Sequence, residues 1–270
     1  MALRVFHVDA FTKTTFKGNP AAVCPLAAWL DDQRMQAVAA ENNLSETAFF
    51  VGDHGKYELR WFSPKVEVQL CGHATLASGF VVLNFLEPEL ESVRFTTRYG
   101  GILTVSRTIS RSGELLSMDF PALPSKTCVQ PPKELLQGLR TESGLREIFE
   151  SNENYFAVFE EENAVQRINP NFALLERLHP FGVCVTARAR ERGVDFVSRY
   201  FAPSYGIPED PVTGSTHCSL APYWSERLGK KSFRARQVST RGGEILCAIS
   251  GDRVVLQGHT VLTLQGTFLI

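Results

Sequence analysis

Hydrophobic and polar residues alternate with a period of two along much of the chain, a pattern that is typical of half-buried strands. Residues 3–9 (LRVFHVD) predict the first strand in this way. Similar patterns and short apolar runs predict strands at 21–26, 47–51, 57–62, 93–98, 101–107, 115–120, 155–159, 182–187, 195–201, 236–240, 244–250, 253–258 and 266–270. Helical spacing predicts helices at 34–42, 72–83, 133–139, 172–178 and 214–228, the first capped by Asp31 or Asp32.

Three landmarks occur twice in the same order, which indicates an internal duplication. They are residues 60–64 (RWFSP) and 199–203 (RYFAP), the helix starts at Gly72 and Gly214, and the turns 97–101 (TRYGG) and 240–243 (TRGG). Such fragments are also common singly, so a chance match is the alternative. We predict two copies of one small fold, each with a strand, a loop, a Gly-led helix and a further strand pair.

A change in composition separates the two copies. The stretch 108–155 is more polar and proline-rich, so we place the boundary between 110 and 125, with halves at 1–115 and 116–264. The start of a helix has unpaired backbone N–H groups that bind anions, and ligand pockets often lie at domain interfaces. We therefore expect the active site in a cleft between the halves, where the starts at Gly72 and Gly214 hold a small carboxylate.

Composition and charge argue against several functional classes. The chain of 270 residues is 44% hydrophobic and 21% charged with a formal net charge of -1, which is typical of a globular protein and not of a nucleic-acid or membrane binder. The short basic run at 230–236 is expected to be a solvated face. We find no signal-peptide pattern and no apolar stretch that would span a bilayer. The six cysteines occur singly, which predicts reduced, mostly buried thiols in a cytoplasmic protein.

Two candidate residues for chemistry lie in the first half. Glu46 enters an otherwise apolar strand, where burial would raise its pKa so that the carboxyl can take and return a proton near neutral pH. A strand-edge Glu that points to solvent is the alternative. His73 would lie in the first turn of a helix, where the helix dipole would keep it neutral and able to donate a hydrogen bond. A packing or surface histidine is the alternative.

The second half has a matching set at its helix start. Asp210 begins a turn after which Thr213, Gly214 and Ser215 can present N–H and hydroxyl donors, although Asp210 could equally be an ordinary helix cap. Cys71 precedes Gly72, where a helix start would lower the pKa of its thiol. A racemase with two thiols would require a second cysteine in place of Thr213, so a paired-thiol mechanism is disfavoured.

Metal and nucleotide chemistry have no sequence signature here. The histidines are far apart and include no His-x-x-x-His, so we predict no metal site. There is no Gly-rich nucleotide motif and no G-x-S-x-G, so we expect neither a nucleotide cofactor nor a serine nucleophile.

The motifs together resemble the PhzF (phenazine biosynthesis-like) family, including its animal members, over nearly the whole chain. The similarity rests on residues 9–11, 16–23, 43–49, 60–62, 71–75 and 209–215. The resemblance implies an α+β fold of the diaminopimelate epimerase type, with two pseudo-symmetric halves that each wrap a mostly antiparallel sheet around a central helix. It also implies a homodimer, in which the C-terminal strand 265–270 returns to complete the first half.

The resemblance implies a cofactor-independent isomerase in which one Glu carries a proton between carbons of a small carboxylate. Glu46, His73 and Asp210 match the catalytic residues, and substrate binding is implied for Asn19, Gly72, His73, Gly214 and Ser215. Two alternatives stay open. One is an amino- or imino-acid racemase or dehydratase that uses Cys71 and Thr213, and the other is a non-enzymatic protein with a protein partner, as the name of one animal member suggests.

Overall fold

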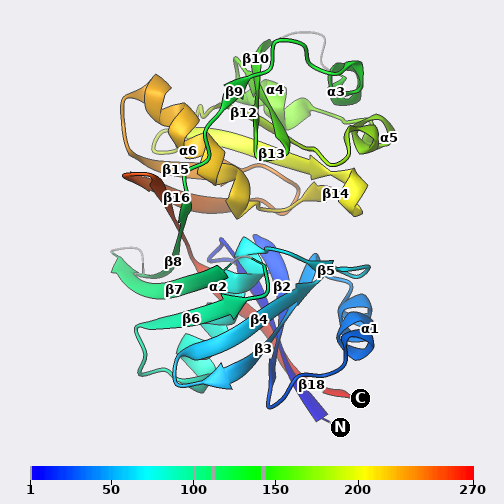
Figure 1. The fold of residues 1–270 in the computed structure, drawn as a ribbon. Helices are drawn as coiled ribbons and strands as arrows, with labels where there is room; N and C mark the ends of the chain where they lie inside the picture. Colours follow the sequence, from blue (N-terminus) through cyan, green and yellow to red (C-terminus); the bar gives the residue numbers. More distant parts are fainter. Residues whose placement is uncertain (1, 100, 111–112, 141–143) are drawn as a thin grey trace. The chain divides into compact units, whose positions relative to one another are not determined.

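The computed structural model describes residues 2–99, 101–110, 113–140 and 144–270, and the chain divides into two compact units (Figure 1). The first unit runs to Asp119 and includes the returning segment Gln257–Ile270, and the second unit is Phe120–Leu256. The first unit contains β1 (Ala2–Ala10), β2 (Asn19–Leu26), α1 (Asp32–Asn42), β3 (Glu46–Asp53), β4 (Lys56–Phe62), β5 (Glu67–Val68), α2 (Gly72–Val81), β6 (Ser92–Thr97), β7 (Gly101–Ser110), β8 (Gly113–Pro121) and β18 (Thr260–Leu269). The second contains β9 (Lys126–Thr127), α3 (Lys133–Leu139), β10 (Leu145–Ser151), β11 (Asn154–Phe159), α4 (Glu162–Arg167), α5 (Phe172–Leu175), β12 (Gly182–Arg188), β13 (Phe196–Ala202), β14 (Ile207–Asp210), α6 (Gly214–Leu228), β15 (Ser232–Gln237), β16 (Gly243–Ser250) and β17 (Arg253–Gly258).

The sheet of the first unit mixes antiparallel and parallel pairs. β1 lies antiparallel to β2 and to β18, β3 to β4, and β6 to β7. β2 lies parallel to β3, and β4 lies parallel to β6. Parallel neighbours need a crossover connection, and α1 and α2 provide the two crossovers. Asp31 caps α1 by accepting from the Arg34 N–H at 2.8 Å, which confirms one of the two predicted caps.

Helix α2 runs through the middle of the first unit, with strands around it (Figure 1). Every residue from His73 to Gly79 is buried, and the helix continues as a π-helical turn over Val82–Leu86. A Cβ on Gly79 would lie 2.5 Å from Val105 Cγ1 on β7, so the glycine allows this strand to approach the helix. A helix that is buried all round lacks an amphipathic pattern, which is why the enclosed position followed from the resemblance and not from periodicity.

The second unit repeats the topology of the first. β10 lies antiparallel to β11, β12 to β13 and β15 to β16, whereas β11 lies parallel to β12 and β13 to β15. Helix α6 connects β13 and β14 to β15, as α2 connects β4 and β5 to β6. The predicted duplication is therefore confirmed in the order and direction of the strands.

An arginine–glutamate pair marks the same place in both copies. Arg60 on β4 donates two hydrogen bonds to Glu67 at 2.7 and 2.8 Å, and Arg199 on β13 donates two to Glu209 at 2.7 and 3.0 Å. Arg199 also donates to the carbonyls of Val165 and Ile168. These partly buried ion pairs explain why an arginine precedes the aromatic residues of both repeated motifs.

The strand register corrects the third landmark of the repeat. Thr97 pairs with Gly101 across β6 and β7, and Gln237 pairs with Gly243 across β15 and β16. The counterpart of Thr97 is therefore Gln237 and not Thr240, because the second turn contains extra residues. Gly100 of the predicted turn lies outside the described residues.

Several other elements differ from the prediction. The strand expected at 236–240 lies earlier, as β15, and the helix expected at 172–178 is the short α5 followed by a 3₁₀ turn over Glu176–Leu178. β10 and α4 were not predicted, because their charged residues hide the apolar positions. The six cysteines are free and all but Cys128 are buried, as predicted. Over the part of the chain that the structure describes, no helix is both long and apolar enough to cross a membrane.

Candidate active site

Glu46, Cys71 and His73 form a buried group at the start of α2, which we call the α2 cluster. Glu46 is the first residue of β3 and is 8% exposed, so the solvent-pointing alternative is wrong. His73 Nε2 lies 3.3 Å from Glu46 Oε2, and His73 Nδ1 lies 3.4 Å from Cys71 Sγ. The imidazole therefore lies between a carboxyl and a thiol, with one ring nitrogen toward each.

The imidazole of His73 is neutral near pH 7. Burial lowers its pKa to about 3, and a hydrogen bond with the backbone at Pro20 opposes this shift. The predicted neutral state is thus supported, but its main cause is burial and not the helix dipole. A neutral imidazole carries one N–H, so it can donate on one side and accept on the other. Glu46 consequently has a partner that can follow its change of protonation without a net charge on the ring.

The start of α2 is open to a ligand. Cys71 is the N-cap residue, and among the described residues no side chain caps this helix start. A Cβ placed on Gly72 would meet no atom within 4 Å, so packing does not require the glycine. The first N–H groups of a helix bind anions, and the space at Gly72 would let a carboxylate approach them. Asn19 is fully buried at the start of β2, next to the Pro20 backbone that faces His73.

The helix start of the second unit is organised by Gln237, which the sequence reasoning missed. The Thr213 hydroxyl donates to Asp210 Oδ2, and the Thr213 N–H donates to Gln237 Oε1 at 2.9 Å. Gln237 Nε2 donates to the Asp210 carbonyl at 2.8 Å. Asp210 is buried against this network, so its side chain is oriented by Thr213 and is not a simple cap. An amide at an inward position of the alternating strand SFRARQ was the available signal.

The remaining predicted residues of the second unit differ in exposure. Gly214 is buried and Ser215 is exposed at the start of α6. His217, to which the sequence assigned no role, is fully buried with Nδ1 2.8 Å from the Thr213 carbonyl oxygen. Burial lowers the pKa of His217 to about 4 and the bond with Thr213 opposes this, so the ring is neutral near pH 7.

The repeat shows that the two halves are chemically unequal. Glu46 pairs with Ala21 across β2 and β3, and the corresponding pair across β11 and β12 is Asn154 with Gly182. A Cβ on Gly182 would lie 2.1 Å from the hydroxyl of Tyr200. That hydroxyl donates to Asn154 at 2.8 Å. The second unit therefore has no room for a carboxylate at the position that Glu46 occupies in the first.

The α2 cluster is also the place where a metal ion would find ligands. One ligand atom from each of its three residues lies within 4.8 Å of the others. The sequence spacing did not indicate this grouping, because β3 and α2 bring distant residues together. The ring of His73, however, presents different nitrogens to Glu46 and Cys71, whereas a metal ion would bind one of them. This geometry differs from a coordination shell, although His73 Nε2 has only a close contact with Glu46 and no hydrogen-bond partner among the described residues.

Comparison with known proteins adds the family. The family model of phenazine biosynthesis-like proteins, PhzC-PhzF, matches residues 8–266. The chain belongs to the PhzC-PhzF family. It is 48% identical over 268 residues to an uncharacterized isomerase of Pseudomonas aeruginosa, with 99% of each chain covered. It is 37% identical over 293 residues to phenazine biosynthesis-like domain-containing protein 1 of Mus musculus, again with 99% of each covered.

A solved structure agrees with the architecture. The crystal structure of a PhzF-family protein from Enterococcus faecalis matches the chain with a TM-score of 0.92 at 40% identity, and all of both chains is covered. The α+β epimerase-type fold implied by the resemblance is confirmed.

Proposed function

We propose that this chain is an isomerase that moves a proton between two carbon atoms of a small carboxylate, with Glu46 as the group that takes and returns the proton. The observation that carries the proposal is the contact of buried Glu46 with neutral His73 at an uncapped helix start. The bacterial relative named as an isomerase supports the reaction class.

The proposed chemistry balances without a cofactor. The Glu46 carboxylate takes a proton from one carbon, and the electron pair of that C–H bond moves into the conjugated system of the substrate. The resulting carboxylic acid then returns the proton to another carbon. The N–H groups at Gly72 and His73 hold the substrate carboxylate. The protonated Glu46 exchanges part of its proton with solvent before it returns it, so that turnover in D₂O introduces deuterium at carbon.

The proposal keeps the roles that the resemblance gives to the second unit. Asp210 takes part in the reaction, and Gly214 and Ser215 bind polar groups of the substrate. The network of Gln237 and Thr213 supports this by fixing the direction of the Asp210 side chain.

A racemase or dehydratase that uses Cys71 is the second candidate. The 3.4 Å contact between Cys71 Sγ and His73 Nδ1 favours it, because a histidine can take the proton of a thiol. The commitment of the Thr213 hydroxyl to Asp210 counts against Thr213 as the opposing base.

Deuterium exchange distinguishes these candidates. The protein is incubated in D₂O with a panel of small carboxylates that have a C–H bond beside a carbonyl group or double bond, and NMR follows the loss of C–H signals. Under the proposal, Glu46→Gln abolishes exchange while Cys71→Ser and the exposed control Glu41→Gln retain it. Loss in Cys71→Ser with retention in Glu46→Gln would support the thiol mechanism. A wild-type protein that exchanges no member of the panel would favour the non-enzymatic alternative.

The homodimer and a protein partner stay predictions. Analytical ultracentrifugation tests the first, since a dimer would sediment at twice the mass of 30.0 kDa.

A further inference from the structure

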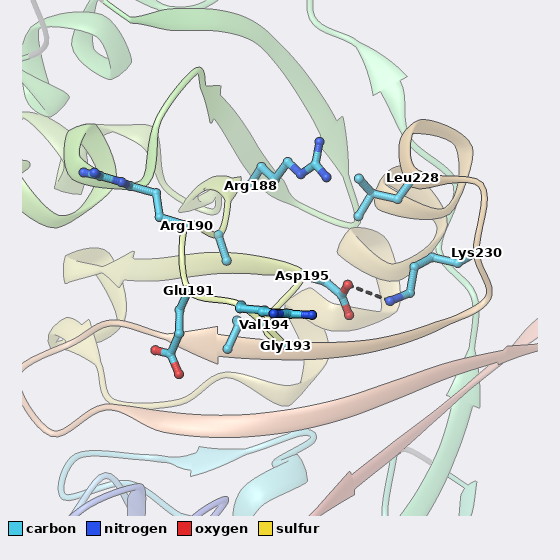
Figure 2. Close-up of a pocket in the computed structure, with 10 residues that line it drawn as sticks. Arg188, Arg190, Glu191, Gly193, Val194, Asp195, Leu228 and Lys230 are labelled. Atoms are coloured by element: carbon cyan, nitrogen blue, oxygen red, sulfur yellow. Dashed lines mark hydrogen bonds and ion pairs between the residues drawn. The ribbon is translucent and has the colours of Figure 1, made fainter.

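The hairpin between β12 and β13 and the end of α6 line an open pocket in the second unit (Figure 2). Its volume is about 340 Å³, which is within the range of pockets for small molecules. Helix α6 has 15 residues and rises about 1.5 Å per residue, so this pocket lies about 20 Å along the helix from the start at Gly214. The pocket is therefore separate from the residues assigned to the proposed isomerase.

The pocket is lined by more cationic than acidic side chains. The cationic residues are Arg188, Arg190, Arg192 and Lys230, and the acidic residues are Glu191 and Asp195. A surplus of positive charge in one small region is costly unless an anion is nearby, because like charges repel. The chain as a whole has a net charge of -1, so this surplus is local.

Both acidic residues already have partners. Asp195 Oδ1 lies 2.6 Å from Lys230 Nζ, and Asp195 Oδ2 accepts from the Arg234 N–H at 2.8 Å. Glu191 forms an ion pair with Arg236 on β15. The guanidinium groups of Arg188 and Arg192 form no ion pair with any residue that the structure describes.

The arginines do not all point the same way. Figure 2 shows Arg188 and Lys230 extending on the side of Leu228, whereas Arg190 extends to the opposite side of the hairpin. The apolar side chain of Leu228 beside these charges offers a surface for an organic group.

We infer that this pocket binds a phosphate-bearing small molecule, held by the guanidinium groups of Arg188 and Arg192, which are unpaired among the described residues. Guanidinium groups bind phosphate through pairs of parallel hydrogen bonds, and a doubly charged phosphate matches two unpaired guanidinium groups better than a single carboxylate does. The volume leaves room beside the phosphate for an attached group against Leu228. The basic run at 230–236 contributes no unpaired charge to the pocket, because Lys230, Arg234 and Arg236 pair with Asp195, Glu244 and Glu191.

Calorimetric titration with inorganic pyrophosphate at fixed low ionic strength tests the inference. Wild type is expected to bind it saturably. Arg188→Ala and Arg192→Ala are each expected to weaken binding about tenfold, the loss of one charge-assisted contact. Arg190→Ala is the matched control and is expected to change the affinity less than about twofold, since its side chain points away. All three arginines are exposed, so the variants are expected to fold.

Several outcomes would overturn the inference. The absence of saturable binding heat in the wild type would overturn it. A loss of affinity in Arg190→Ala equal to that in Arg188→Ala would also overturn it, because it would indicate a general effect of surface charge. Binding that survives the Arg188→Ala Arg192→Ala double variant but is lost in Ser215→Asp would place the anion at the start of α6. Binding of an acidic peptide or RNA without binding of pyrophosphate would assign the surface to a macromolecule. Glu46→Gln is expected to leave the titration unchanged, so failure here and failure of the proposed isomerase are separate results.

Discussion

Acid is expected to destabilise this protein through His217 in a defined pH window. The ring is fully buried, stacks on Phe196 with centroids 5.8 Å apart, and is hydrogen-bonded to the Thr213 carbonyl. Its Nε2 has no hydrogen-bond partner among the described residues. Protonation would place a positive charge in apolar surroundings, so the folded state resists it.

The magnitude follows from the pKa. Burial lowers the pKa of His217 from 6.5 to about 4. Between these values the unfolded chain binds more protons than the folded chain, so the free energy of unfolding rises with pH and falls as acid is added. The slope for one histidine is about 1.4 kcal/mol per pH unit, and the whole window costs about 3 kcal/mol. His73, whose pKa burial lowers to about 3, adds a similar slope.

Urea unfolding between pH 7 and pH 4 measures this slope. His217→Gln removes the titrating group. The rise in its free energy of unfolding between pH 4.5 and pH 6 is therefore expected to be less steep than that of the wild type, by about 1.4 kcal/mol per pH unit. His54→Gln is the matched control, because the side chain of His54 is 92% exposed, and it is expected to retain the wild-type slope. An unchanged slope in His217→Gln would refute the reasoning.

Three further predictions concern packing, charge and metal. Gly79→Ala is expected to lower the free energy of unfolding by about 1–3 kcal/mol, because the added methyl group overpacks against Val105. Adding Val105→Ala to this variant should recover part of the loss, and urea unfolding of the single and double variants measures both effects. Arg199→Met is expected to cost about 2–3 kcal/mol in the same assay, because it leaves the partly buried Glu209 and the carbonyls of Val165 and Ile168 without their donor. Arg234→Met, on the more exposed pair with Glu244, should cost less than about 1 kcal/mol. Treatment with a chelator followed by dialysis is expected to leave deuterium exchange unchanged, because His73 faces Glu46 and Cys71 with different ring nitrogens. Exchange that is lost on chelation and restored only by added zinc would contradict a metal-free reaction.

Local signals predicted much of the fold, and long-range pairing explains what they missed. The starts of α1, α2 and α6 have local sequence markers, namely a capping aspartate and two glycines, and each lies within a residue or two of its predicted place. The parallel pairs β2–β3 and β11–β12 depend on crossovers of many residues, so no local pattern reveals them. The counterpart of Thr97 was misassigned because an identical dipeptide, TR, occurs a few residues later in the second copy, and only the register identifies Gln237.

In the candidate site, too, local sequence signals identified residues but not the long-range contacts between them. Glu46 and His73 were identified from local context and from the resemblance, but their 3.3 Å contact depends on a strand and a helix that are distant in sequence. Gln237 was missed because nothing near it in the sequence marks a partner for Thr213. The neutral state of His73 was attributed to the helix dipole, whereas burial causes it, and burial is a property of the whole unit.

The central claim is that Glu46 carries the proton, and deuterium wash-in during turnover tests it most directly. With a carboxylate that the wild type exchanges, Glu46→Gln is expected to slow C–H exchange by about 100-fold or more, the contribution of a general acid–base group. Glu46→Asp is expected to retain part of the rate, and Glu41→Gln all of it. Exchange in Glu46→Gln at the wild-type rate would contradict the account.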